Sequence, residues 1–382
     1  MDKKQNILMQ ARQQPLNLAK SYLNDAVKPN ANAIDSDAEA LQNAVFGLGN
    51  LGLLALRVPS SWGGWEVSEE MFQDFQELVT RHSGALAFLQ TQHQSASAML
   101  VQSQNKLLKQ KYLPLMGDGN VLLGIGFSHL RRGGEPIVKA HPVTGGYQIE
   151  GFVPWVTGFG LFQEFIVAAC LPDGQAVFGV VPFVETRAAT GAIIFSQPLK
   201  LAAMASTNTV TATLTNWFLP EESVVSIKPS GWIHANDKKN VLNATGLILG
   251  CAMAGLDIVQ AGYSKREFSF IAQAFESLSQ ELSNCRTAIR QAQQNCNISL
   301  NRHLHLRAWA IDLAVRCAHA AVTVSSGAAN YTNHAAQRVY REALVFTVTG
   351  QTTAVMEATL ALVVRSKVQF NDDMMHSYDL GF

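Results

Sequence analysis

The sequence carries little charge and no excess of either sign. Only 15% of its 382 residues are charged, and 29 basic residues balance 29 acidic ones, which gives a net charge of +0. A balanced surface has no general attraction for a phosphate backbone, so we expect no nucleic-acid partner. Hydrophobic residues make up 48% of the chain. This length and composition predict a folded protein with two or three packed units rather than a disordered one.

Several recognisable kinds of site are also missing. Five cysteines are scattered without a CxxC pair, which predicts buried thiols in a reducing compartment rather than disulfides. These cysteines are Cys170, Cys251, Cys285, Cys296 and Cys317. His303 and His305 diverge on a helix and make a poor metal pair, so no metal is expected. The absence of GxGxxG, GxxxxGK[ST] and GxSxG motifs disfavours the common nucleotide-binding and hydrolase sites.

The chain shows no evident targeting or membrane segment. Its first residues, MDKKQNILMQARQQP, lack the apolar core of a signal peptide. The most apolar run, residues 240–256, is interrupted by Asn243 and three glycines and is followed at once by Asp257. We interpret this run as a buried helix that is too short to cross a bilayer. These features predict a cytoplasmic protein with no membrane partner.

Hydrophobic periodicity divides the chain into three segments of an α+β protein. Residues 1–118 have helical spacing, with caps at Asp35-Ser36-Asp37 and further helices over about 67–79, 84–102 and 105–116. Residues 119–225 change to short β-rich runs between turn signals and predict a central antiparallel β domain. Residues 226–382 return to helical spacing over about 239–264, 268–295, 301–329 and 335–365, with a break near Gly350. Long helices of this kind predict a four-helix bundle.

Short motifs follow one another across nearly the whole chain. They are LRVPSSWGGW (56–65), GYQIEGFVPWVTG (146–158), MASTNTVTATLTNWFLPEESVV (204–225) and RVYREA (338–343). In order and spacing they resemble the acyl-CoA dehydrogenase family. The resemblance implies a homodimer or homotetramer that binds FAD between the β domain and the bundle. It also implies a flavin-dependent oxidoreductase that acts on the CH–CH group of an acyl thioester, such as acyl-CoA, or of a related small substrate.

The resemblance assigns the contacts of the flavin ring. Trp155 and Thr157 match the segment in which an aromatic wall packs behind the ring and a hydroxyl lies near its reactive N5. The alternative for Trp155 is a plain role in the β-domain core. A second segment includes Phe127, and in it Ser128 keeps the family's hydroxyl and Gly133 its close backbone approach. Arg131 and Arg132 are new in this segment, and they either reach an acidic group or form a solvated basic loop.

The contacts implied for the dinucleotide end of FAD are reduced. Lys265 replaces an arginine, Phe268 is kept, and Glu276 replaces a glutamine and adds a negative charge near a diphosphate. Gly327 alone survives from a QxxGG motif, and Gln351 completes the segment that normally carries the catalytic base. The resemblance therefore implies FAD, or FMN in its place, held by a weakened set of contacts.

The residue that would abstract a proton is missing. Dehydrogenation α,β to a thioester needs a carboxylate near the α carbon, and the family's glutamate position holds Thr349, a neutral hydroxyl. The family's alternative position, on the first bundle helix, holds Lys239. Asp237 reaches the site only if that helix starts later than predicted. Glu342 is expected in a salt bridge, and Glu357 lies about 12 Å along a helix from Thr349.

Two alternatives follow from the missing base. Relatives that hydroxylate substrates with oxygen at the flavin need no glutamate and often use a histidine or serine near the ring. The candidates here are Ser128, His129, His334 and Thr349, beside Asp237 as a displaced base. The other alternative is a degenerate, non-catalytic scaffold that binds acyl groups or a partner.

Overall fold

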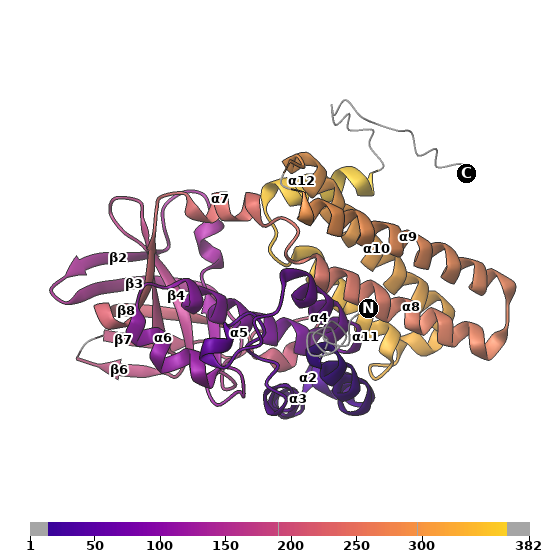
Figure 1. Ribbon diagram of the computed structural model, residues 1–382, viewed down its shortest axis with the longest axis horizontal. Coiled ribbons are helices and arrows are strands. Elements are labelled where there is room, and N and C mark those ends of the chain that lie inside the picture. Colours follow the sequence, from indigo (N-terminus) through magenta and orange to yellow (C-terminus); the bar gives the residue numbers. More distant parts are fainter. Residues whose placement is uncertain (1–13, 190, 296, 365–382) are drawn as a thin grey trace, which may run out of the picture.

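The computed structural model describes residues 14–364 except residues 190 and 296. Helices come first, strands follow from Leu123 to Lys228, and helices return from Trp232 onward. Figure 1 shows the sheet at one end of an elongated molecule and the bundle at the other, with the N-terminal helices beside both. The predicted α+β class, with a central sheet between helical units, is confirmed. Cys296 lies outside the described residues; the thiols of Cys251, Cys285 and Cys317 are free and buried as expected, and that of Cys170 is free and partly buried.

The described part of the N-terminal unit is built of helices, which include a π-helical turn. They are η1 (Leu23–Val27), α2 (Lys28–Ser36), α3 (Ala38–Asn50), α4 (Glu69–His82), α5 (Gly84–Gln102) and α6 (Lys106–Tyr112). Asp37 caps α3 as predicted, because its carboxylate accepts a hydrogen bond from the backbone N–H two residues later. Asp35 is no cap, contrary to expectation. It is buried, accepts a hydrogen bond from Met204 N at 2.7 Å and pairs with Arg341 at 2.8 Å, so it links three parts of the chain.

The central unit is one sheet with the strand order β6-β7-β8-β3-β2-β4-β5-β9, and β1 pairs with β4. The strands are β1 (Leu123–Gly126), β2 (Val138–Val143), β3 (Gly146–Val156), β4 (Glu164–Cys170), β5 (Ala176–Pro182), β6 (Thr186–Ala188), β7 (Gly191–Phe195), β8 (Val210–Pro220) and β9 (Val224–Lys228). Most pairs are antiparallel as predicted, but β1 and β4 run parallel, and β2 meets β4 in parallel at one residue pair. Periodicity missed these pairings because β4 reaches β1 only after the intervening β2–β3 hairpin.

The C-terminal unit begins with a short helix before the bundle. Its elements are α7 (Trp232–Lys239), α8 (Thr245–Arg266), α9 (Ser269–Gln294), α10 (Leu300–Ser325), the 3₁₀ turn η7 (Ser326–Asn330), α11 (Ala335–Val348) and α12 (Thr353–Val363). The first bundle helix starts later than predicted, because turns occupy residues 240–244 after α7. The predicted break near Gly350 is confirmed, and its φ of 59° lies in the left-handed region that glycine tolerates best.

Helix α8 is the central helix of the bundle. By length and composition it could cross a membrane, so the expectation that this run is too short was wrong, yet 67% of its most apolar window is buried inside the protein. It packs against α4, α10 and α11. A Cβ on Gly250 would lie 2.4 Å from Glu77 O, and one on Gly255 would lie 2.7 Å from the backbone of Cys317. Its glycines therefore allow close helix packing, and the prediction of a buried helix is confirmed.

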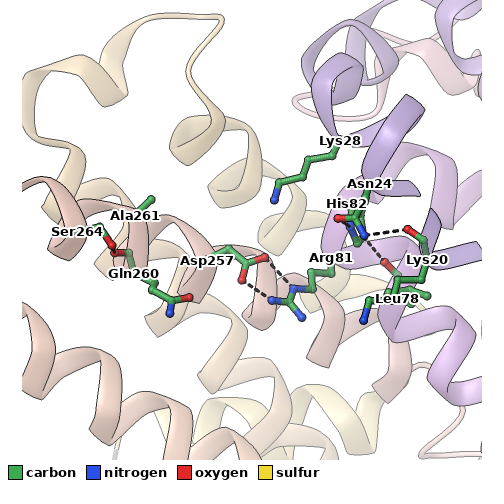
Figure 2. Close-up of a pocket in the computed structure, with 10 residues that line it drawn as sticks. All are labelled: Lys20, Asn24, Lys28, Leu78, Arg81, His82, Asp257, Gln260, Ala261 and Ser264. Carbon is green, nitrogen blue, oxygen red and sulfur yellow. Dashed lines mark hydrogen bonds and ion pairs between the residues drawn. The ribbon is translucent and has the colours of Figure 1, made fainter. Parts of the chain in front are cut away.

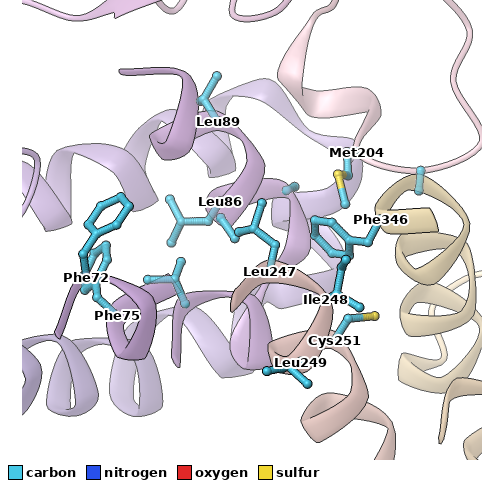
Figure 3. Packing of buried hydrophobic residues seen from close by; sticks show 14 of the residues in the cluster. Phe72, Phe75, Leu86, Leu89, Met204, Leu247, Ile248, Leu249, Cys251 and Phe346 are labelled. Atoms are coloured by element: carbon cyan, nitrogen blue, oxygen red, sulfur yellow. The ribbon is translucent and has the colours of Figure 1, made fainter. Parts of the chain in front are cut away.

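The N-terminal helices and the bundle share one hydrophobic core. Figure 3 shows Phe75 of α4 and Leu86 of α5 on one side of Leu247 and Ile248 of α8, and Phe346 of α11 on the other. All these side chains are buried. This core fixes α11 and α8 relative to each other, and with α11 the turn at Thr349.

Candidate active site

Trp155 lies near the end of β3 and is not a core residue. Its neighbours Val153 and Val156 are fully buried, whereas Trp155 is 48% exposed. The β3–β8 register shifts between Val153 and Val156, so Trp155 falls in an irregular part of the ladder, where a bulge redirects side chains. The indole therefore offers a free aromatic face beside a rigid strand, which excludes a plain core role.

Thr157 lies two residues after Trp155, and its hydroxyl donates a hydrogen bond to another threonine of the protein. The Thr207 hydroxyl donates to Met204 O at 2.7 Å. Thr207 is therefore left to accept from Thr209 at 3.2 Å, and Thr209 to accept from Thr157 at 3.0 Å. Since each hydroxyl has one proton, this chain leaves only the lone pairs of Thr157 for a ligand. Thr157 is thus suited to accept a hydrogen bond from a ligand N–H group.

The second flavin segment forms a short 3₁₀ turn, η4 (Ser128–Arg131). The Phe127 ring packs edge-on against Phe178 at 5.4 Å, and Ser128 and Gly133 are exposed. An added Cβ on Gly133 would meet nothing within 4 Å, so packing among the described residues does not require a glycine at this position.

His129 is the buried member of this turn, at 4% exposure. Its Nε2–H donates to Ala168 O at 3.0 Å, and its Nδ1 is buried and meets no hydrogen-bond partner in the part of the chain that the structure describes. Burial lowers the pKa of His129 to about 4, so the ring is neutral at pH 7. Because Nε2–H is already used, the only catalytic roles left to His129 are to accept a hydrogen bond or a proton at Nδ1.

Asp237 is engaged by Arg131 and is not a free base. Arg131 Nε and Nη2 donate to the two carboxylate oxygens of Asp237 at 2.7 and 2.8 Å. A base role for Asp237 required the first bundle helix to start later than predicted, and it does start later. Asp237, however, belongs to the separate helix α7, which precedes the bundle helix. The ion pair instead joins η4 to α7 across the junction of sheet and bundle. Arg131 is correspondingly not free to bind a phosphate, whereas Arg132 is exposed.

Thr349, which the resemblance places at the family's base position, is the C-cap of α11. Its hydroxyl donates to Val345 O at 2.9 Å, and its carbonyl accepts a hydrogen bond from Arg307 Nη2 at 2.5 Å. Gln351 is partly buried two residues later. Nothing in this turn is basic, so the described residues supply no proton acceptor here.

Arg307 is a residue that sequence reasoning missed. It lies on α10, is 2% exposed, and donates to Val241 O at 3.0 Å as well as to Thr349 O. Its Nε is buried and has no hydrogen-bond partner among the described residues. Burial lowers the pKa of Arg307 to about 10, so it remains charged at pH 7. No carboxylate of residues 14–364, leaving out 190 and 296, pairs with it, and a buried cation without such a partner is costly. In the sequence, the only signal for this residue was one arginine on the apolar face of a long helix.

The remaining acids and bases lie elsewhere. Glu342 is fully buried and accepts hydrogen bonds from Arg338 at 2.6 Å and from Gly84 N at 3.1 Å, which confirms the predicted salt bridge. Burial raises the pKa of Glu342. Lys239 and Glu357 are exposed.

His334 is a helix cap rather than a catalytic candidate. Its Nδ1 accepts a hydrogen bond from Ala336 N at 3.1 Å at the start of α11. Thr349 lies at the other end of that helix, about 20 Å away. The two residues therefore cannot act on the same bond.

The residues expected at the dinucleotide end lie far from Trp155 within one chain. Lys265, Phe268 and Glu276 are exposed around the turn from α8 to α9, and Gly327 is exposed in η7. Figure 1 shows α8 running away from the sheet toward this turn, and a helix of 22 residues is about 33 Å long. The nearby Arg266 donates to Val324 O at 2.7 Å, so that part of its guanidinium is already used.

Comparisons with known proteins agree with this fold. Residues 10–120 match the acyl-CoA dehydrogenase N-terminal domain. Mitochondrial isovaleryl-CoA dehydrogenase of Solanum tuberosum is 25% identical over 265 residues, which cover 65% of this chain and 64% of that protein. The 3-(aryl)acrylate reductase of Clostridium sporogenes is 20% identical over 363 residues, which cover 90% of this chain and 96% of that protein.

A solved structure shows the same fold over nearly the whole length. The glutaryl-CoA dehydrogenase of Mycobacterium smegmatis in complex with FADH2 has a TM-score of 0.78 at 13% identity, over 96% of this chain and 95% of that one. The domain match carries the assignment further than fold alone. Residues 10–120 therefore belong to the acyl-CoA dehydrogenase N-terminal domain family, and the chain as a whole has the fold of the acyl-CoA dehydrogenases.

Proposed function

We propose that this protein binds FAD with the flavin ring against Trp155 and acts as an oxidoreductase on an acyl thioester such as acyl-CoA. The observation that carries the proposal is the half-exposed indole of Trp155 at the family's ring position, two residues before a threonine whose hydroxyl proton is already used within the protein. The relatives named above support it, since two are acyl-CoA dehydrogenases and one is an acrylate reductase.

The residues at the ring end fit a flavin. Trp155 offers a flat apolar face, and Thr157 offers an acceptor for a ring N–H group. When bound, the flavin supplies hydride transfer to or from the β carbon of the substrate. The chain itself contributes the platform, the hydrogen-bond acceptor and the exclusion of water.

The residues at the dinucleotide end fit only if a second copy of the chain supplies them. Lys265, Phe268 and Gly327 are exposed and lie about a helix length from the start of α8. We therefore propose a homodimer or homotetramer in which one subunit holds the ring and its partner holds the adenosine end. FMN, which has no adenosine, is the alternative cofactor, and it would not need the partner.

The reaction proposed here does not depend on a carboxylate at residue 349. Asp237 is neutralised by Arg131, Glu342 is neutralised by Arg338, and Thr349 is a hydroxyl. The buried charge of Arg307 beside Thr349 favours a negatively charged or strongly polarised oxygen of the substrate at this position rather than a base.

The same observation favours oxygen-dependent hydroxylation as a second candidate, because that reaction also needs no glutamate. A non-catalytic scaffold is the third candidate, and it predicts that no flavin is bound.

Flavin titration separates these proposals. Purified protein should be yellow, or it should quench the fluorescence of added FAD to saturation, and FMN measured in parallel identifies the preferred cofactor. Anaerobic addition of an acyl-CoA should then bleach the flavin only slowly, because among the described residues no base takes the α proton and it has to leave to solvent water as the hydride leaves the β carbon. Product formation only with reduced flavin and oxygen would favour hydroxylation. A colourless protein with no thermal shift in FAD or FMN would refute the flavin proposal and leave the scaffold.

A further inference from the structure

A cavity of about 500 Å³ lies on the side of the bundle that faces the N-terminal helices, away from Trp155 and Thr349. Figure 2 shows it between the helical residues around Lys20 and Lys28, the end of α4 at Arg81, and the second half of α8 at Asp257. Nothing in the proposed flavin chemistry uses this cavity. Its volume is large enough for a small metabolite.

Positive charge dominates the lining. Arg81 donates to both oxygens of Asp257 at 2.7 and 2.6 Å, and the two charges of this pair cancel. Lys20 and Lys28 also line the cavity, and neither makes an ion pair with any of the described residues. With His82 neutral, the lining carries two uncompensated positive charges. Such a pair of ammonium groups attracts a multiply charged anion.

His82, at 7% exposure, is one of the residues that line the cavity. In its neutral form it has one N–H group but two neighbouring hydrogen-bond acceptors. Its Nδ1 lies 2.8 Å from Leu78 O, and its Nε2 lies 3.2 Å from Asn24 Oδ1. The Asn24 amide is oriented by its own bond, in which Nδ2 donates to Lys20 O at 2.9 Å. Both ring nitrogens of His82 therefore face acceptors, which a neutral imidazole with one N–H cannot satisfy and an imidazolium can.

The charges around the cavity oppose that second proton. Burial lowers the pKa of His82, and Arg81 and Lys28 lower it further, against the raising effects of the Leu78 contact and of Asp257. An anion next to the lysines would offset their charges. The ring could then take up the proton for which its two hydrogen-bond partners are already placed.

We propose that this cavity binds a phosphate group and that binding is coupled to proton uptake by His82. Lys20 and Lys28 provide the charge, and the side-chain amide of Gln260, which also lines the cavity, provides a neutral hydrogen-bond donor. The Ser264 hydroxyl already donates to Gln260 O at 3.1 Å, so it can only accept. The phosphate is either free or part of a small phosphorylated molecule. A phosphate bound between the N-terminal helices and α8 binds only the folded chain, so it should also stabilise the protein against unfolding.

Isothermal titration calorimetry on the full-length protein tests the site. Inorganic phosphate, ADP and sulfate are the probes, and each should bind saturably to the unmodified protein. Lys20→Gln/Lys28→Gln should weaken all three by at least about tenfold, since each removed charge contributes a charge-assisted contact. Lys106→Gln/Lys109→Gln is the matched control, because it removes the same charge on α6 and should leave the affinity unchanged.

The source of the phosphate follows from the probes. ADP that binds more tightly than phosphate, and that loses this affinity in Lys20→Gln/Lys28→Gln, would identify a nucleotide in this cavity rather than at the proposed FAD site. Equal affinities would identify the phosphate group alone. Failure of every probe to bind would overturn the proposal. Equal affinities of the unmodified protein and the Lys20→Gln/Lys28→Gln variant would place any binding elsewhere and would overturn it too.

Sulfate tests the coupling, because its own charge is constant across this pH range. Sulfate should bind more tightly as the pH falls from 7.5 toward 5.5, and titrations in two buffers of different ionisation enthalpy should show net proton uptake. His82→Gln should retain sulfate binding and lose both effects, and its unfolding transition shows whether the variant is folded. Sulfate affinity that is independent of pH in the unmodified protein would overturn the coupling. None of these measurements depends on flavin or on turnover, so their failure is distinct from failure of the proposed function.

Discussion

Replacing Thr349 with glutamate tests whether the site lacks only its proton-abstracting group. The carbonyl of Thr349 lies 2.5 Å from Arg307 Nη2, so a carboxylate on the same residue would lie roughly 5 Å from the guanidinium charge. At an effective dielectric constant of about 20, that separation is worth roughly 3 kcal/mol. The attraction would lower the pKa of the new glutamate by about 2 units from its usual value near 4.3. We therefore expect Thr349→Glu to be a weak base that exchanges the α proton of a bound acyl-CoA slowly.

A second change should strengthen that base. In Arg307→Met/Thr349→Glu the guanidinium is gone and burial alone acts on the carboxylate, which raises its pKa. A base with a higher pKa abstracts a proton more readily, and we expect exchange about tenfold faster than in Thr349→Glu. The methionine also leaves the carbonyls of Val241 and Thr349 unpaired, at about 1 kcal/mol each.

Deuterium incorporation at the α carbon, followed by NMR in D₂O with FAD-loaded protein, measures the exchange. Thr349→Gln is the control and should show only background exchange, and thermal unfolding of each variant shows that it is folded. Equal rates in the single and double variants would refute the electrostatic reasoning about Arg307. Rapid α-proton exchange in the unmodified protein would refute the absence of a base altogether.

Three further predictions concern the surroundings of the site. Trp155→Ala should weaken FAD binding by about tenfold while Trp155→Phe largely retains it; equal affinities in fluorescence titrations would show that Trp155 is not the platform. Arg131→Met should lower the free energy of unfolding by about 1 to 3 kcal/mol because it strands the Asp237 carboxylate, and adding Asp237→Leu should recover most of the loss; a denaturant-based double-mutant cycle with no coupling would contradict this. Burial lowers the pKa of both His93 and His129 from 6.5 to about 4, so the unfolded chain binds more protons within this window. Stability should therefore fall as the pH drops from 6.5 to 4, by up to roughly 3 kcal/mol per histidine, and denaturation curves at pH 7 and 4.5 that coincide would exclude it.

Local sequence patterns were enough to predict the three-part fold. The change from a helical to a strand period near Val121 and back after Val225 reflects which side chains must face a core, and that is a property of neighbours along the chain. The cap at Asp37 and the break at Gly350 are equally local, whereas Asp35, predicted as a cap, makes long-range contacts instead. The parallel pairing of β1 with β4 was missed because it joins segments whose contact depends on the route of the chain between them.

The site divides in the same way. The sequence alone placed Thr349 at the family's base position and Trp155 at its ring position, because both follow from motif spacing. It also excluded a carboxylate at residues 349 and 239, because residue type is read directly.

Only the tertiary structure decided what those residues can do. Arg131 reaches Asp237 across 106 positions, and Arg307 reaches Thr349 across 42. Such pairings depend on how helices and sheet are packed, and no periodicity encodes them. Burial is likewise a property of the folded chain: it leaves Trp155 half-exposed beside buried neighbours, holds His129 neutral, and isolates the charge of Arg307. The free energy of a charge or a hydroxyl depends on its solvation and partners, so its chemistry is set only once distant segments have met.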